Sequence, residues 1–364
     1  MSTLKVNAIR GTGASSDAIS VSSTDGTCTA KITNNLSNRR INQNGACVVA
    51  QRGTSSTGTE YKTVDRWRST FSQVAVTTTQ HVLTDADTGP WEKGFRYSYH
   101  LTNTSTDSGS DAWCEFGTRI EAQDLCNSGW VHSSTSSYIT YSFWAKSSLA
   151  GTYYTWLRSK DGTNKTYVSS FVLAANTWKK VSVTAPGASN VTINNDNGVG
   201  LNVNISPYWG TDYTDSGTGT GSWETFSSGT RLPDYAQNWC NTANAVFEAT
   251  GLQIEASDHE TEFEHRLYGD ELARCQRYYY KPPLNTGGGY YTAAYQYHPS
   301  YKMATVEFPV TMRSTPTFTV TFGNTTAAFT EYYPSESHWK GYNSSSSTDS
   351  NVYYIIAFQA DAEL

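Results

Sequence analysis

Alternating apolar and polar positions are the clearest pattern in this chain, and they predict antiparallel β-strands. In the run YITYSFWAKSS (138–148) every second residue has an apolar side chain. Because successive side chains of a strand point to opposite faces, one face of this strand is predicted to enter a core while the other faces away. The inward set is Ile139, Tyr141, Phe143 and Ala145, and the outward set is Thr140, Ser142, Trp144 and Lys146.

Similar runs recur along the chain between clusters of turn-forming residues. The predicted strands are ACVVAQR (46–52), FRYSYHLT (95–102), TYYTWLRS (152–159), TYVSSFVL (166–173), WKKVSVTA (178–185), GLNVNIS (200–206) and AVFEATGLQIEA (245–256). Many short antiparallel strands imply two sheets packed face to face, as in a sandwich or jelly roll. We therefore predict a mostly β protein whose central domain is a jelly-roll β-sandwich.

Changes in composition and residue pattern divide the chain into four segments. We predict an attachment or oligomerisation segment of thin strands at 1–35, a jelly roll at 36–268, a short helical linker at 269–281 and a small β domain at 282–364. Segment 1–35 contains too little apolar mass to close a core of its own. It is expected to dock on the next domain, on identical chains or on a larger particle.

The run ELARCQRYYYK (271–281) is the most helix-like part of the chain. Asp270 is the predicted N-cap, and Glu271 falls in the first turn. Leu272, Cys275 and Tyr279 share the spacing of one helical face. Only Glu271 offers an acid or base, so we interpret the helix as a joint across one end of the jelly roll, not as a catalytic element.

Composition supports the β prediction and excludes several classes of protein. Aromatic residues make up 13% of the chain and charged residues only 16%, with a net charge of −6. That balance, without any cluster of Lys and Arg, argues against a nucleic-acid surface. The N-terminal residues lack the apolar core of a signal peptide, and no run of 18 apolar residues predicts a membrane span. The six scattered cysteines form no CxxC pair and are expected to be free buried thiols, with disulfides as the alternative.

Several distinctive motifs occur along the chain: NRRINQNGACVVAQRG (38–53), VDRW (64–67), SFWAKSSLAGTYY (142–154), NTWKKVSVT (176–184), GLQIE (251–255), TEFEHRLY (261–268), ELARCQRYYY (271–280) and FQADAEL (358–364). With these motifs the chain resembles virion structural proteins of tailed bacteriophages, especially cyanophages and other marine phages. The resemblance covers roughly 36–281 and the last residues. The run SFWAKSSLAGTYY is also similar to jelly-roll carbohydrate-binding modules, which implies fold more strongly than ligand.

The resemblance implies a tail fibre or host-recognition protein that mounts on the virion tail after assembly in the host cytoplasm. Such proteins are commonly homotrimers, and threefold symmetry would complete the thin terminal segments. The expected partners are identical chains, other tail or baseplate proteins, and a host-surface glycan or receptor, with no nucleic acid and no membrane insertion. No coiled-coil heptads support the trimer from sequence. The alternatives are a capsid decoration or head fibre protein, and a polysaccharide depolymerase.

Catalytic and metal chemistry is weakly indicated, and we expect no enzyme activity, no cofactor and no metal site. The run HETEFEH (259–265) is not HExxH; as a strand it would place His259 and His265 on one face with Phe263 between them. NNDNG (194–198) and TDADTG (84–89) could supply oxygen ligands for calcium, but such residues are also ordinary turn formers. Possible glycosidase carboxylates are Glu115, Glu121, Asp124 and Glu224, although nothing in the sequence pairs them.

Two aromatic patches are the candidate ligand-binding sites. The long loop 208–239 contributes Trp209, Tyr213, Trp223 and Trp239, and the patch GGGYYTAAYQYHPSYK (287–302) contributes Tyr290, Tyr291, Tyr295, Tyr297 and Tyr301. Aromatic rings stack on the faces of sugars, which favours glycan recognition. The alternatives are that the loop rings anchor the loop to the core, and that the second patch lines a trimer axis.

Overall fold

The computed structural model confirms the mostly β fold class. It describes residues 6–10, 12, 17–24, 28–30, 38–283, 291–298, 301–322, 329–343 and 354–364. Five sheets account for the strands of this part of the chain. The helices found in it are short: α1 at Ala122–Cys126 and α2 at Tyr268–Gln276.

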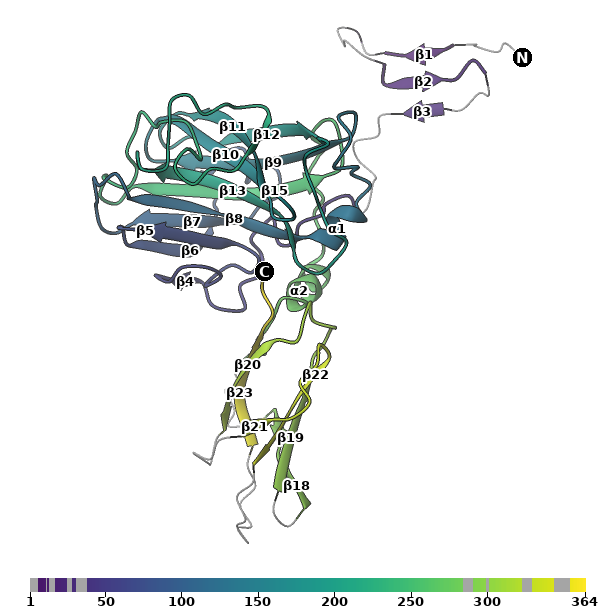
Figure 1. Ribbon diagram of the computed structural model, residues 1–364, viewed down its shortest axis with the longest axis vertical. Helices are drawn as coiled ribbons and strands as arrows, with labels where there is room; N and C mark the ends of the chain where they lie inside the picture. Colours follow the sequence, from purple (N-terminus) through teal and green to yellow (C-terminus); the bar gives the residue numbers. More distant parts are fainter. Residues whose placement is uncertain are drawn as a thin grey trace.

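The body of the molecule is a sandwich of two six-stranded antiparallel sheets (Figure 1). The first has the order β14-β11-β10-β13-β8-β5, with β5 Arg68–Ser72, β8 Trp113–Glu121, β10 Gly151–Ser159, β11 Lys165–Leu173, β13 Val199–Trp209 and β14 Trp223–Thr225. The second has the order β12-β9-β15-β7-β6-β4, with β4 Ser55–Ser56, β6 Val76–Val82, β7 Tyr97–Asn103, β9 Tyr138–Ser147, β12 Lys179–Pro186 and β15 Val246–Glu255.

The main core lies between these two sheets. The predicted inward set of strand β9 is fully buried, whereas Trp144 and Lys146 of the outward set stay partly exposed. Phe116 of the first sheet meets Phe247 of the second edge-on at 5.6 Å between ring centroids. The alternation read from the sequence therefore identifies the core face of this strand correctly.

The predicted strand at 46–52 is wrong, because this segment is an irregular loop. The side chain of Asn44 replaces a neighbouring strand: its Oδ1 accepts from the Val49 N–H at 3.0 Å, and its Nδ2 donates to the Val49 carbonyl at 2.8 Å. Cys47 adopts a φ of 58°, which no strand residue has. Local side-chain hydrogen bonds thus compete successfully with the sheet ladder.

A second, smaller sandwich forms the C-terminal module, at the end of the molecule opposite the N-terminal strands (Figure 1). One sheet has the order β18-β19-β22-β21, with β18 Tyr295–His298, β19 Tyr301–Glu307, β21 Thr330–Glu331 and β22 His338–Asn343. The other pairs β23 Tyr354–Asp361 with β16 Tyr279–Tyr280, β17 Thr292–Ala293 and β20 Thr317–Phe322. A separate apolar cluster fills the space between them, with Trp339 stacked on Phe318 at 4.5 Å.

The N-terminal strands form a sheet of their own. They are β1 Ala8–Ile9, β2 Ile19–Val21 and β3 Cys28–Ala30, and in the described residues they pair only with one another. Their expected role in attachment stays a prediction.

The described cysteines agree with the expectation of free thiols. Cys47, Cys114, Cys126, Cys240 and Cys275 are free thiols, and four of the five are buried. Neither helix in the described part of the chain is long and apolar enough to cross a membrane.

Helix α2 lies between the body and the C-terminal module (Figure 1). The predicted N-cap Asp270 is wrong: the helix begins at Tyr268, three residues before the predicted start, and Leu267 is its N-cap without a side-chain hydrogen bond. Glu271 is firmly held. Its carboxylate is 3% exposed, is bound by the Arg40 guanidinium and accepts from the Asn44 N–H at 2.5 Å. The helix is therefore fixed by a buried acid held by the segment before the body.

The end of the chain is fixed to the body in the same way. Arg66 has a fully buried side chain that binds the Glu363 carboxylate, and Arg52 reaches the same carboxylate at 3.3 Å. Burial alone would lower the pKa of Arg66, but Glu363 holds it above its ordinary value. The guanidinium also lies over the Tyr278 ring, 3.6 Å from its centroid. Two buried cations from the body thus converge on one carboxylate that follows strand β23.

Glu363→Gln is expected to destabilise the protein by about 3 kcal/mol, because it removes the carboxylate that binds the fully buried Arg66 and one of the three carboxylates around Arg52. Urea unfolding followed by fluorescence measures this change. Glu92→Gln is the matched control, since Glu92 is exposed on the body and the same substitution there should change stability by less than about 0.5 kcal/mol. Equal stability of the two variants would contradict the role assigned to Glu363.

Candidate functional site

The outer face of the C-terminal sheet β18-β19-β22-β21 carries a cluster of tyrosines. Ala304, Val306 and Trp339 point into the core of the module. Because side chains alternate along a strand, the residues next to them in sequence point outward. The strand register places Tyr295 opposite Met303, and Met303 opposite Tyr342, so that three strands contribute to one row.

Two further tyrosines extend this row into a surface. The rings of Tyr301 and Tyr332 both meet the Tyr342 ring edge-on, each with 5.7 Å between centroids. Together Tyr295, Tyr301, Met303, Tyr332 and Tyr342 line a hollow of about 370 Å³. We call these five residues the tyrosine face.

The tyrosine face is exposed to an unusual degree for aromatic side chains. The exposed fractions are 53% for Tyr295, 41% for Tyr301 and 43% for Tyr332, and the adjacent Tyr333 reaches 71%. Each ring offers an apolar plane and a hydroxyl, which together suit a ligand with C–H faces and hydroxyl edges. The five lining residues include no carboxylate, histidine or cysteine. The arrangement is therefore suited to stacking and hydrogen bonding.

The sequence predicted part of this face. Tyr295 and Tyr301 lie on it, whereas Tyr291 packs against Phe358 on the other sheet at 5.4 Å between centroids. Tyr297 belongs to β18, where the structure describes only its backbone, and Tyr290 lies outside the described residues. Sequence reasoning missed Met303, Tyr332 and Tyr342. Because Trp339 is buried, the alternation in HWKGYN (338–343) places Tyr342 on the outer face of its strand. The pairing of this strand with β19, however, cannot be predicted from the local sequence.

The aromatic residues of the long loop are placed differently. The rings of Trp209, Trp223 and Trp239 are 1%, 8% and 0% exposed. Trp209 stacks on Trp113 at 4.4 Å, and Tyr213 meets Trp209 edge-on at 5.1 Å. Trp209 and Tyr213 pack on the outer side of the first sheet, whereas Trp223 and Trp239 belong to the main core. Both placements anchor the loop, as the anchoring alternative describes. None of the three tryptophans presents its ring to a ligand in this conformation.

Of the four possible catalytic carboxylates, Glu121 and Asp124 are neighbours, while Glu224 lies on a distant strand of the sheet. Burial raises the pKa of Glu115, which lies 3.8 Å from Arg68. Burial would also raise the pKa of Glu121, but two hydrogen bonds from Arg277 lower it. Burial and the nearby Glu121 raise the pKa of Asp124, which lies on α1. Glu224 is exposed on β14.

The sequence motifs considered for metals form loop structure. The segment 259–265 is not a strand; the Glu264 carboxylate caps the Asn38 and Arg40 N–H groups, each at 2.8 Å, and His265 bonds the Lys93 carbonyl. In 194–198, Asp196 accepts from the Gly198 N–H at 2.9 Å within a turn. In 84–89, Asp87 accepts from the Thr84 N–H at 3.0 Å. Both motifs therefore use an aspartate to stabilise a turn.

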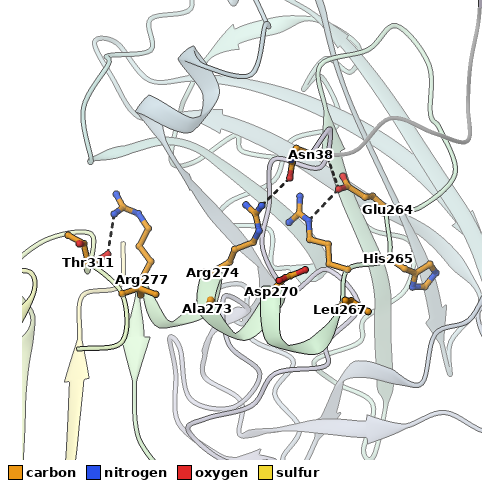
Figure 2. A pocket seen from close by; sticks show the side chains of 11 residues that line it. Asn38, Glu264, His265, Leu267, Asp270, Ala273, Arg274, Arg277 and Thr311 are labelled. Atoms are coloured by element: carbon orange, nitrogen blue, oxygen red, sulfur yellow. Dashed lines mark hydrogen bonds and ion pairs between the residues drawn. The ribbon is translucent and has the colours of Figure 1, made fainter. Parts of the chain in front are cut away.

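A larger cleft of about 620 Å³ lies where α2 meets the C-terminal module (Figure 2). Its polar side chains are engaged with each other: Arg274 donates to the Asn38 side chain at 3.1 Å, and Arg277 to the Thr311 carbonyl at 3.5 Å. Burial and the nearby Arg40 and Arg274 lower the pKa of Arg266 to about 10. The cleft therefore lies at the contact between α2 and the C-terminal module. Its charged side chains take part in the hydrogen bonds around this contact.

Comparisons with known proteins provide no family for the chain. No protein-family model and no curated protein matches it. The chain is similar to the enzymatically active domain of bacteriophage CBA120 tailspike protein 4 over 60% of its length and 22% of that chain, at 13% identity and a TM-score of 0.30. It thus spans about a fifth of the tailspike structure.

Two carbohydrate-binding structures are similar to the same degree. A CBM4 structure matches over 60% of this chain and 99% of its own, at 11% identity and a TM-score of 0.30. The family 11 carbohydrate-binding module from Clostridium thermocellum, solved with a β-1,3-1,4-mixed-linked tetrasaccharide, matches over 58% and 98%, at 13% identity and a TM-score of 0.28. At these values the likenesses carry no argument about ligand, activity or assembly.

The geometry of the tyrosine face depends on Gly341. A Cβ atom there would fall 2.3 Å from the Trp339 ring, which stacks on Phe318 under the face. Gly341→Ala is expected to displace Trp339 and destabilise the protein by about 1–3 kcal/mol, measured by thermal unfolding and near-ultraviolet circular dichroism. Gly269→Ala is the control, because Gly269 lies in α2 with no atom within 4 Å of the added Cβ and should be neutral or slightly stabilising. A native near-ultraviolet spectrum for Gly341→Ala would refute the packing argument.

Proposed function

We propose that this chain is a structural and adhesive protein of a phage tail fibre, which binds a host-surface glycan through the tyrosine face without catalysis. The single observation that carries the proposal is the gathering of exposed tyrosines on one sheet face around a hollow of about 370 Å³. Exposed apolar surface of this kind is uncommon unless it contacts something. Rings that bear hydroxyls suit the mixed apolar and polar surface of a sugar.

The position on a virion tail is supported by the sequence resemblance. Glycan binding is supported by the chemistry of the tyrosine face alone. A homotrimer would present three such faces on one particle, and several weak sites acting together give high avidity. The face lies in the module farthest from the N-terminal strands, so attachment through the N-terminus would leave it pointing outward (Figure 1).

Two alternative roles predict different contacts for the tyrosine face. In a capsid decoration protein or a trimer built around the tyrosine face, the rings would contact other subunits. A depolymerase would bind a glycan and also release reducing sugars, and one carboxylate substitution would abolish that release. The adhesive role requires binding without release.

Tyr301→Ala and Tyr342→Ala are each expected to weaken glycan binding by about tenfold, corresponding to roughly 1.4 kcal/mol of lost stacking. The probe is an array of bacterial surface polysaccharides, followed by calorimetry with the polysaccharide that binds. Tyr301→Phe should retain most of the affinity, because the ring remains. Tyr268→Ala is the matched control, since Tyr268 is 59% exposed on α2, away from the face.

Three outcomes would overturn the proposed binding role. Unchanged affinity in both alanine variants would remove the tyrosine face from the site. Dissociation of an oligomer by Tyr342→Ala in sedimentation, without any glycan binding by the unaltered chain, would make the face a subunit contact. Release of reducing sugar from the bound polysaccharide would replace adhesion by hydrolysis.

Immunogold electron microscopy of virions with antibody against this chain is expected to label the tail or its fibres. The label reports position and is independent of ligand binding. Label spread over the head would reject the tail fibre in favour of a decoration protein, and labelled particles of an unrelated phage serve as the control for background.

A further inference from the structure

Three side chains that are far apart in sequence meet on the outer face of the second body sheet. His81 lies on β6, His100 on β7 and Glu248 on β15, which are adjacent strands. His100 is directly opposite Glu248, and His81 is opposite Ser98, two residues from His100. One ligand atom from each of the three lies within 4.8 Å of the others. This cluster lies on the body, away from the tyrosine face.

The orientation of His100 is the most informative part of the cluster. Its Nε2 lies 3.1 Å from the Thr102 hydroxyl, whereas its Nδ1 is buried and has no hydrogen-bond partner. The Thr102 hydroxyl can accept from Nε2 or donate to it, so the contact is compatible with either tautomer of the ring. Nδ1 faces Glu248 Oε2 at 3.5 Å. With the ring proton on Nε2, a metal ion can bind both of these atoms.

The spacing fits a tetrahedral metal ion. Ligand atoms bonded to Zn²⁺ at about 2.0–2.1 Å lie about 3.3 Å from each other. The pair His100 Nδ1 and Glu248 Oε2 already has this spacing. His81 is exposed on its strand, and its ring centroid is 4.9 Å from that of His100, so a rotamer change is enough to bring it in.

The surroundings hold Glu248 in place and keep it ionised. Its Oε1 binds the Lys146 ammonium at 2.8 Å, and its Oε2 accepts from the Ser98 hydroxyl at 2.8 Å. Lys146 is also bound by Asp87 at 3.0 Å, so two carboxylates share one cation and leave a local negative charge for another. With a metal ion on Nδ1, His100 Nε2–H donates to the Thr102 hydroxyl, and such hydrogen bonds from metal ligands to outer groups are typical of metal sites.

We infer that His81, His100 and Glu248 form a binding site for a divalent transition-metal ion of the zinc class, with a fourth position open to solvent. Two imidazoles and one carboxylate are a ligand set that zinc accepts and that calcium and magnesium do not favour. The bound ion would join three strands of the sheet on the side opposite the core. It would therefore stabilise the body in addition to any role of the open position.

Isothermal titration of the full chain, first dialysed against EDTA, with ZnCl₂ tests the site. The expected result is one Zn²⁺ per chain, with a rise in melting temperature on loading. His81→Ala should weaken zinc binding by about tenfold or more. His259→Ala is the matched control, because His259 is a partly exposed histidine outside the cluster. Magnesium in excess should not compete.

A second variant separates metal binding from folding. His100→Gln removes the nitrogen ligand while keeping a polar side chain of similar size, and its circular dichroism reports whether the sheet is intact. A folded His100→Gln chain that binds zinc as the unaltered chain does would overturn the inference. Failure of the unaltered chain to take up zinc, or equal losses in His81→Ala and His259→Ala, would overturn it as well, the latter showing adventitious binding by surface histidines.

Discussion

The buried contacts between arginines and carboxylates at the joint are the constraint on which the rest of the structure depends. Arg40 holds Glu271 of α2, while Arg52 and Arg66 hold Glu363 after strand β23. These arginines all lie before strand β5, on either side of the short strand β4. A buried guanidinium without its carboxylate is strongly unfavourable, so the contacts specify where helix and C-terminal strand must lie. The orientation of the tyrosine face relative to the body follows from that specification.

Burial on both sides distinguishes the first body sheet from the second. Tyr154 and Trp156 pack under the long loop, while Tyr153 and Leu157 belong to the main core. The loop thus covers the outer face of this sheet as a third layer, in which Leu232 and Tyr213 pack with Trp209. The second sheet keeps a polar outer side, where Lys146, Asp87 and Glu248 bind one another. The proposed glycan site and the proposed metal site therefore lie outside the loop, on the tyrosine face and on the second body sheet.

The sequence predicts the features that depend on local periodicity. Strand β9 is identifiable because one of its faces is buried in the core, so that apolar and polar residues alternate along it. The segment 46–52 is not, because hydrogen bonds from the Asn44 side chain hold its backbone in a loop, and composition does not reveal these bonds. Two of the five residues of the tyrosine face, Tyr295 and Tyr301, lie in one short patch of the sequence. Tyr342 and the cluster of His81, His100 and Glu248 depend on strand register between distant segments, and the register is decided by packing of the whole sheet.

A four-stranded sheet needs only one apolar face to build a two-layer module, so the tyrosines on its other face require a separate cause. Thr305 and Lys340, paired in the next row, show that polar residues fit the same surface. Tyr301 and Tyr332 support Tyr342 edge-on, which fixes the rings before any partner arrives and lowers the entropic cost of binding. Obligate subunit contacts resemble a divided core. A surface of hydroxyl-bearing rings around a single methionine is instead suited to a wet and reversible contact, and this favours a glycan over a permanent neighbour as the partner of the face.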